Sequence, residues 1–261
     1  MKTIDLNADI GEADRPDWKA AELDILSIVS SANIACGGHA GDALSMRQTL
    51  RAAKENNVNV GAHPSYPDRE NFGRRSLKLG EDLSAEELKR SLIQQVKSLM
   101  EIAEKEGISV NYIKPHGALY NDAVADKEKA DLIIDVLQDI NPRLTLLGGP
   151  NSEMMKAAKK ADIRFITEGF IDRRYTDDGH LRSRKLPGAV LESDSDRIKQ
   201  ALSLATHGHV ETDTGQRLAI KAESLCLHGD SAGVVASARK ARNALEKAHI
   251  KISSFIQQEI K

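Results

Sequence analysis

The stretch Ile113-Lys-Pro-His-Gly117 ends a short apolar run with two basic side chains and a glycine, and six other apolar runs end in a similar turn. Those six endings are Asp5-Leu-Asn-Ala-Asp-Ile-Gly-Glu12, Ile34-Ala-Cys-Gly-Gly-His-Ala-Gly-Asp42, Gly61-Ala-His-Pro64, Leu146-Leu-Gly-Gly-Pro150, Glu168-Gly-Phe-Ile-Asp-Arg-Arg174 and Cys226-Leu-His-Gly-Asp230. Only Leu146–Pro150 carries neither a charge nor a histidine. Parallel strands that alternate with helices bring their carboxyl ends to one face, where α/β barrels build active sites. The pattern therefore predicts an enzyme whose site is shared among these endings.

Helical patterns separate the apolar runs, which gives seven β-then-α units. The predicted strands are Thr3–Leu6, Ala32–Ala35, Val58–Ala62, a run ending at Tyr112–Ile113, Leu144–Leu147, Ile163–Thr167 and Ser224–Leu227. The predicted helices are Trp18–Val29, Ala43–Lys54, Ser84–Gly107, a helix around Ile133 capped by Asp126, Ser152–Ala161, Ser195–Ala205 and Ser231–Lys247. Residues 65–83 and 170–190 form two long loops, and loops of this length are uncommon unless functional. We expect both to act as lids or substrate walls.

No low-complexity linker interrupts the units, so we expect a single α/β domain over residues 1–261, built as a TIM-like barrel. A doubly wound open sheet uses the same units, and periodicity does not separate the two architectures.

Composition excludes several classes of protein. With 40% hydrophobic and 29% charged residues the chain is typical of a globular enzyme, and its net charge of −2 gives no reason to expect nucleic acid or an anionic membrane as partner. The amino terminus lacks the apolar region of a signal peptide, and no apolar stretch is long enough to span a bilayer. The two cysteines, Cys36 and Cys226, form no disulfide framework and are expected to be small buried thiols. We expect a cytoplasmic protein.

Four polar residues surround the predicted end of the first strand: Asp5, Asn7, Asp9 and Glu12. Asp5 and Asn7 lie two positions apart, so on a strand they face the same side. The pattern fits a polar strand exit with Asx-type turns. It equally fits a carboxylate that serves as a general base or a metal ligand.

Four of the eight histidines, His39, His63, His116 and His228, lie just past predicted strand ends. With Asp9 and Asp230 nearby, their imidazoles suit a divalent cation such as Zn²⁺. No HExxH motif is present, however, and without a metal the same groups would move protons near neutral pH.

Positive charge near the predicted mouth comes from Lys114 and from two arginine pairs, Arg74-Arg75 and Arg173-Arg174. Arginine suits bidentate binding of carboxylate or phosphate. We expect an ion pair with Glu168 or Asp172 to hold Arg173. No P-loop and no GxGxxG motif occurs where a nucleotide-binding fold would need it.

Several long motifs together resemble a known family. They are Asp5–Glu12, Ser31-Ala-Asn-Ile-Ala-Cys-Gly-Gly-His-Ala-Gly-Asp42, Phe72-Gly-Arg-Arg75, Tyr112-Ile-Lys-Pro-His-Gly-Ala-Leu-Tyr-Asn121, Asp172-Arg-Arg-Tyr-Thr-Asp-Asp-Gly179 and Leu227-His-Gly-Asp230. The set resembles the A-subunit family of bacterial 5-oxoprolinase, also called the LamB/YcsF lactam-utilisation family, from about residue 3 to residue 245.

The resemblance implies a seven-stranded (β/α) barrel of the glycoside hydrolase/deacetylase type. It also implies hydrolysis of 5-oxo-L-proline to L-glutamate with ATP as co-substrate, giving ADP and phosphate, and two partner subunits. A lactam is stabilised by resonance, and phosphorylating its amide oxygen would activate it. A base must then deliver water to the carbonyl carbon and an acid must protonate the ring nitrogen. Because the chain has no recognisable kinase element, we expect phosphorylation to involve the partners.

From the residues and the resemblance together, we predict catalytic roles for Asp9, His39, His116 and Asp230. The predicted substrate-binding residues are Asn7, Glu12, Lys114, Arg74, Asp172 and Arg173. His63 and His228, with Asp9, are the predicted ligands of a divalent metal. Two alternatives remain open: a metal-dependent amide hydrolase or deacetylase that acts alone, and a non-catalytic scaffold protein.

Overall fold

The strands close into a seven-stranded parallel barrel in this computed structural model, which describes residues 2–227 and 233–256. The barrel strands are β1 (Lys2–Ile10), β2 (Ser31–Ala35), β3 (Asn59–His63), β4 (Val110–Ile113), β5 (Thr145–Gly148), β6 (Phe165–Phe170) and β9 (Ser224–Leu227). Each strand pairs with the next in this order, and β9 returns to β1, with Asn7 opposite Cys226 on that side and opposite Ser31 of β2 on the other. Closure confirms the predicted barrel and excludes the open sheet.

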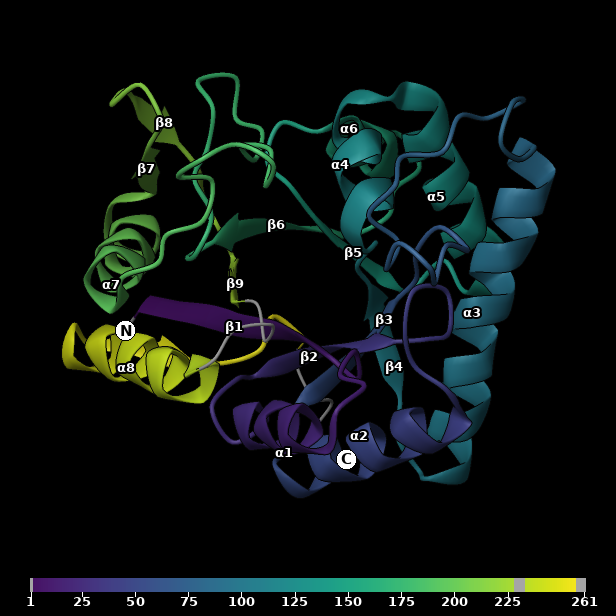
Figure 1. Ribbon diagram of the computed structural model, residues 1–261, viewed down its shortest axis with the longest axis horizontal. Coiled ribbons are helices and arrows are strands. Elements are labelled where there is room, and N and C mark those ends of the chain that lie inside the picture. The colour runs from purple at the N-terminus through teal and green to yellow at the C-terminus, as the bar shows by residue number, and fades with distance from the viewer. Residues whose placement is uncertain (1, 228–232, 257–261) are drawn as a thin grey trace.

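Helices surround the barrel, as Figure 1 shows. They are α1 (Pro16–Ile25), α2 (Ala43–Glu55), α3 (Ala85–Lys105), α4 (Gly117–Ala125), α5 (Lys127–Ile140), α6 (Glu153–Lys160), α7 (Asp194–Leu202), a π-helical turn (Ser203–His207) and α8 (Val234–Lys247). Neighbouring helices pack together, with α8 against α1 and α7, and α3 against α2 and α5. This outer layer buries the apolar outward faces of the short strands, as parallel sheets require.

The clearest predicted helix is confirmed as α3. Ser84 and Glu87 form its capping box: the Ser84 hydroxyl accepts from the Glu87 N–H, and the Glu87 carboxylate accepts from the Ser84 N–H at 2.7 Å. Leu88, Leu92 and Val96 are buried along one face. Two signals, a cap and a 3.6-residue apolar period, therefore determine this element locally.

Several predicted boundaries are wrong. The first strand extends to Ile10 rather than ending at Leu6, because Asn7 and Asp9 alternate with apolar residues and point to polar partners inside the barrel. The first helix ends at Ile25, four residues before the predicted end.

Four elements were not predicted. Helix α4 follows His116 directly, and strands β7 (His209–Glu211) and β8 (Arg217–Ala219) form an antiparallel hairpin. Strand β10 (Ile250–Ile252) pairs in parallel with the start of β1. These strands are only three residues long, which is too short for a periodicity signal.

Both long loops leave the carboxyl ends of barrel strands: one joins β3 to α3 and the other joins β6 to α7. Cys36 and Cys226 are free and buried, as predicted, and burial raises the pKa of the Cys36 thiol to about 12. Among the described residues, no helix has the length and apolar character needed to cross a bilayer.

Candidate active site

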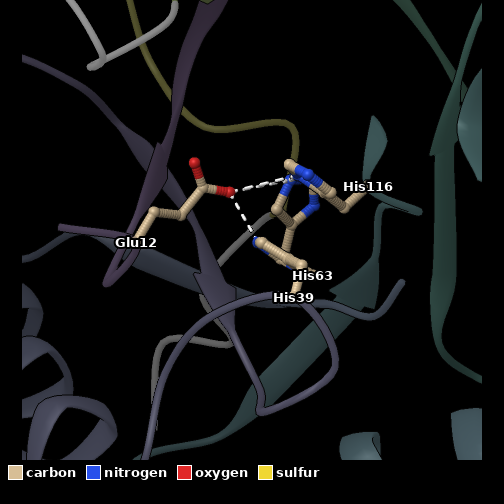
Figure 2. A group of neighbouring side chains, drawn as sticks. All are labelled: Glu12, His39, His63 and His116. Carbon is tan, nitrogen blue, oxygen red and sulfur yellow. Dashed lines mark hydrogen bonds and ion pairs between the residues drawn. The ribbon is translucent and has the colours of Figure 1, made fainter. Parts of the chain in front are cut away.

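The carboxyl ends of β1 to β4 bring a carboxylate and three histidines together. Glu12 lies in the turn after β1, His39 lies between β2 and α2, His63 ends β3, and His116 follows β4. Figure 2 shows the four side chains converging on one point. One Glu12 oxygen, Oε1, lies 2.8 Å from His39 Nε2, 3.1 Å from His116 Nδ1 and 3.7 Å from His63 Nε2. Residues far apart in the sequence therefore share one cluster.

Backbone carbonyl groups fix two of the imidazole rings. The Nδ1–H of His63 donates to the carbonyl oxygen of Lys114 at 2.7 Å, and the Nε2–H of His116 donates to that of Phe72 at 3.0 Å. A carbonyl oxygen can only accept, so it fixes the hydrogen on those nitrogens. The remaining nitrogens, His63 Nε2 and His116 Nδ1, face each other at 3.0 Å.

Burial and charge separate the proton affinities of the three rings. Burial lowers the pKa of His39 to about 4 and also lowers the pKa of His116. Burial opposes charge on His63 as well, but the negative charge of Asp9 raises the pKa of His63 above its usual value. Burial likewise opposes ionisation of Glu12, yet contact with His116 and His39 holds the pKa of its carboxyl well below the usual value. At neutral pH the cluster thus has an ionised carboxylate and neutral His39 and His116.

A hydrogen-bonded support holds the turn that carries Glu12. The carboxylate of Glu22, in α1, accepts from the backbone N–H groups of Gly11, Glu12 and Ala13 at 2.9 to 3.1 Å. Burial raises the pKa of the Glu22 carboxyl to about 7. Glu22 was not predicted from the sequence, because its role depends on a turn that only the folded chain brings to it.

Beneath the histidines, Lys114 forms the centre of a buried ionic network. Its ammonium is 2.9 Å from Asp9 Oδ1 and from Glu168 Oε1, and 3.1 Å from the sulfur of Cys226. Burial opposes charge on Lys114, but the negative charge of Asp9 and Glu168 keeps its pKa well above the usual value. Glu168 therefore pairs with Lys114.

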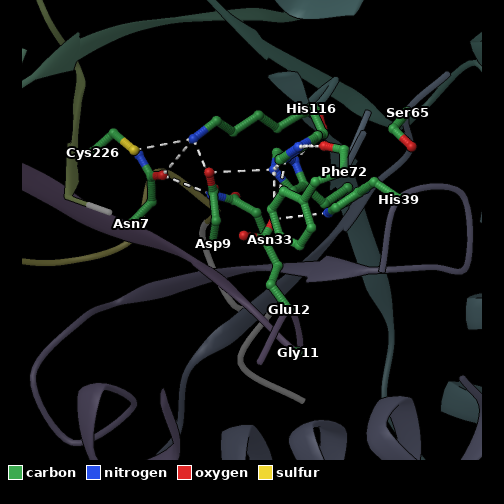
Figure 3. Close-up of polar contacts among 12 residues, drawn as sticks. Asn7, Asp9, Gly11, Glu12, Asn33, His39, Ser65, Phe72, His116 and Cys226 are labelled. Carbon is green, nitrogen blue, oxygen red and sulfur yellow. Dashed lines mark hydrogen bonds and ion pairs between the residues drawn. The ribbon is translucent and has the colours of Figure 1, made fainter. Parts of the chain in front are cut away.

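Amides complete this network. Asn33 donates to Asn7 Oδ1 and to Asp9 Oδ1, each at 2.7 Å, and accepts from the hydroxyl of Tyr112 at 2.7 Å. Figure 3 shows Asn7, Asp9 and Asn33 side by side, with Cys226 close to Asn7. Asn7 is fully buried, and its Oδ1 accepts a hydrogen bond from the Lys114 ammonium. Asn7 therefore supports Lys114 from below.

Asp5 lies deeper still, and the Asx-turn interpretation of this stretch is wrong for it. Its carboxylate accepts from the hydroxyls of Ser30, Ser31 and Ser224, and burial raises its pKa to about 6. It is 1% exposed and lies in the strand, not in a turn. Asp5 is a structural acceptor at the floor of the barrel.

A cavity of about 630 Å³ opens above Asp9, Glu12, His63, Lys114 and His116. Basic side chains also line it: Arg74 from the first long loop, and Arg173, Arg184 and Lys185 from the second. Gly149 and Pro150, from the uncharged ending Leu146–Pro150, also line the cavity. A cavity of this size and polarity suits a small anionic ligand.

Backbone carbonyls hold the guanidinium of Arg173, which donates to the carbonyl oxygen of Arg182 at 2.7 Å and to that of Ala189 at 3.4 Å. Of its two expected ion-pair partners, Glu168 pairs with Lys114 instead, whereas the negative charge of Asp172 acts on Arg173. Burial lowers the pKa of Arg173 to about 10. Arg173 therefore ties together two parts of the second long loop.

The structure brings together nine of the predicted site residues around this cavity, either in its wall or in direct contact with a residue of the wall: Asn7, Asp9, Glu12, His39, His63, Arg74, Lys114, His116 and Arg173. Asp172 is buried beside Arg173. The predicted residues His228 and Asp230 lie outside the described residues. Glu168, Arg184 and Lys185 were not predicted as site residues; an acidic residue inside the apolar strand Phe165–Phe170 was the available signal for Glu168.

Known proteins match this chain over its length. A model of the LamB/YcsF family matches residues 4–260. The A subunit of 5-oxoprolinase from Haemophilus influenzae (strain PittEE) is 44% identical over 254 residues, covering 97% of this chain and 100% of the relative. The crystal structure of the lactam utilization protein from Thermus thermophilus has a TM-score of 0.87 at 36% identity and covers 98% of this chain and 100% of that chain.

A more distant likeness concerns the fold alone. The Xyl-CE4 domain of a multidomain xylanase from the hindgut metagenome of Trinervitermes trinervoides has a TM-score of 0.50 at 15% identity, covering 97% of this chain and 87% of that chain. The two chains share the barrel fold.

Proposed function

Because the chain belongs to the LamB/YcsF family, we propose that it acts in an ATP-dependent 5-oxoprolinase, where it hydrolyses the activated lactam of 5-oxo-L-proline to L-glutamate. The observation that supports this most is the cavity, which is lined by Asp9, by members of the histidine cluster and by arginine side chains. Asp9 and the histidines suit attack of water on an amide, and the arginines suit binding of an anion.

Asp9 is the base in this proposal. It lines the cavity, and the 2.9 Å contact of its Oδ1 with the Lys114 ammonium favours the ionised form. Its second oxygen, Oδ2, lies 3.3 Å from His63 Nε2. Asp9 takes a proton from the attacking water and returns it to the ring nitrogen as the carbon–nitrogen bond breaks, so one carboxyl group serves as base and then as acid. This step leaves an acyl phosphate on the opened chain, which a second water hydrolyses to glutamate and phosphate.

His63 supports this base. Its Nε2 lies 3.3 Å from Asp9 Oδ2, and positive charge on the ring would keep Asp9 ionised until water attacks. Arg173 is oriented by two backbone carbonyls before substrate enters, so it can bind the substrate carboxylate at little further cost in entropy.

Activation by ATP is assigned to the complex with two partner subunits. The basic residues Arg74, Arg184 and Lys185 that line the cavity would then bind the phosphoryl group of an O-phosphorylated lactam. In this scheme the partners transfer the phosphoryl group, and this chain supplies water and proton transfer.

The test is a reconstituted assay of the three subunits with 5-oxoproline and ATP, measuring glutamate and phosphate separately. We expect glutamate only when this chain is present, and a loss of about 10²- to 10⁴-fold in Asp9→Asn. Asp178→Asn, which changes an exposed carboxylate on the second long loop, is the matched control and should retain activity. Lactam opening by this chain alone without ATP would refute the proposal and favour the amide hydrolase that acts alone.

A further inference from the structure

The two facing nitrogens of His63 and His116 carry lone pairs that repel each other when both rings are neutral. Each ring already donates its one hydrogen, in the neutral form, to a backbone carbonyl oxygen. The nitrogens left over therefore direct lone pairs at each other across 3.0 Å, beside the carboxylate of Glu12. Lone pairs that converge in a buried site require a positive charge between them.

The third imidazole, that of His39, can also face a positive charge in this cluster. The Nε2 atom of His39 faces Glu12 Oε1 at 2.8 Å, and its other nitrogen, Nδ1, is buried without a hydrogen-bond partner among the described residues. The Nε2–H therefore donates to the Glu12 carboxylate, and because Nδ1 has no partner the hydrogen can move to Nδ1 when an ion takes its place, which frees the Nε2 lone pair. His39 also stacks on His116 with ring centroids 3.5 Å apart, which keeps its Nε2 next to the facing pair.

From this arrangement we propose that Glu12, His39, His63 and His116 bind one divalent transition-metal ion, for which Zn²⁺ is the best fit. The four donor atoms lie within 4.8 Å of one another. Tetrahedral zinc with bonds of about 2.0–2.1 Å needs donor atoms about 3.3 Å apart. The separations of 2.8, 3.0, 3.1 and 3.7 Å lie on both sides of that value. Because the His39 and His116 rings are stacked and parallel, the His39 ring would tilt out of the stack on binding so that both lone pairs reach the ion.

The donor set selects the class of ion. Three imidazole nitrogens and one carboxylate oxygen suit zinc and its neighbours, whereas Mg²⁺ and Ca²⁺ prefer oxygen ligands. The hydrogen bonds from His63 and His116 to backbone carbonyls are the outer contacts that usually orient metal-bound histidines. Glu22 orients Glu12 in a similar way, because its carboxylate accepts from the backbone N–H of Glu12.

The charge of the surrounding network points to a dication. Asp9, Glu12 and Glu168 contribute three carboxylates to this region, against the single ammonium of Lys114. A proton shared by the two imidazoles would leave one negative charge in this set of groups, whereas a divalent cation neutralises it. Uncompensated charge in a buried site is costly, so the dication is the better match.

The inferred set differs from the ligands predicted from the sequence. It keeps His63 but replaces Asp9 with Glu12, because Asp9 Oδ1 is engaged by Lys114 and Asn33. It adds His39 and His116, which the prediction treated as catalytic. The inference rests on the geometry of the cluster and stands independently of the proposed 5-oxoprolinase activity.

The experiment is a metal titration of the full-length chain after treatment with a chelator. We expect one equivalent of Zn²⁺ by calorimetry, a rise in the melting temperature with added Zn²⁺, and visible absorption typical of tetrahedral coordination when Co²⁺ replaces it. His63→Gln and Glu12→Gln should each weaken Zn²⁺ binding by more than the roughly 10- to 100-fold that loss of an outer contact costs.

The matched control is the double variant His207→Ala/His209→Ala, which removes two neighbouring histidines outside the cluster and should bind Zn²⁺ as the wild type does. If the chelator-treated wild type takes up no Zn²⁺ or Co²⁺ stoichiometrically, the proposal is wrong. It is also wrong if folded His63→Gln binds Zn²⁺ as tightly as the wild type, or if binding disappears in the control. Because the readouts are binding and absorption, neither result depends on whether the chain opens 5-oxoproline.

Discussion

Replacing Lys114 with methionine should destabilise the protein strongly, although methionine fills much of the same space. Lys114 is 2% exposed and is the shared partner of Asp9 and Glu168, each at 2.9 Å. Its removal leaves two buried carboxylates without their cation, and breaking a buried ion pair in this way costs about 3–5 kcal/mol. For a chain of this size the cost corresponds to a fall of about 6–20 °C in melting temperature.

Urea denaturation of wild type and Lys114→Met gives the free energy of unfolding, and a second substitution isolates the cause. Glu168→Gln removes one of the two orphaned charges, so Lys114→Met/Glu168→Gln should recover about 1–3 kcal/mol of the loss. The deficit should also shrink as pH falls, because protonation neutralises the unpaired carboxyl groups. Lys78→Met is the control: Lys78 is an exposed partner of Glu81, and such pairs contribute about 0–1 kcal/mol.

The reasoning would fail if Lys114→Met lost less than about 1 kcal/mol. It would also fail if the loss were unchanged by Glu168→Gln and by acid. Either result would mean that the network is stabilised by packing and hydrogen bonds rather than by the ammonium.

Three further predictions concern the floor and the rim of the barrel. Burial raises the pKa of Asp5 to about 6, so its protonated form adds stability at low pH that is lost as pH rises. In urea denaturation, the free energy of unfolding of Asp5→Asn should therefore rise by about 2 kcal/mol relative to the wild type between about pH 4.5 and 6.5. Parallel pH profiles of the two proteins would contradict this. Glu22→Ala leaves three backbone N–H groups without an acceptor, which should cost about 1–3 kcal/mol by the same assay and weaken Zn²⁺ binding; no change in either would show that the turn holds itself. In Gly61→Ala the new Cβ would lie 2.2 Å from the Tyr112 ring, so calorimetric melting should show a loss of about 1–3 kcal/mol, whereas an unchanged melting temperature would mean that the ring moves freely.

Local signals determined the elements that were predicted well. Helix α3 carries both a capping box and a regular apolar face, and the later barrel strands are short apolar runs between turns. The first strand was predicted four residues too short because its inward residues Asn7 and Asp9 are polar. Their partners, Ser224, Asn33 and Lys114, come from other strands and could not be identified from periodicity.

The candidate site shows the same division. Each polar ending indicated a side chain near the carboxyl end of a strand, and this was enough to select Asp9, His39, His63 and His116. The sequence could not assign partners, because hydrogen bonds between strands depend on register and closure. Pairing of Lys114 with Glu168, rather than of Arg173 with Glu168, is one result that register decided.

The sequence by itself determined the seven β-then-α units and the residue types at their ends, because periodicity and turn chemistry act over a few neighbouring residues. Only the tertiary structure decided that the sheet closes, since closure requires β9 to pair with β1 across more than two hundred residues. Closure in turn places Glu12 against His39, His63 and His116, and buries Lys114 between Asp9 and Glu168. Burial then sets the charges of these groups, because the free energy of an ion depends on the water and the partners around it.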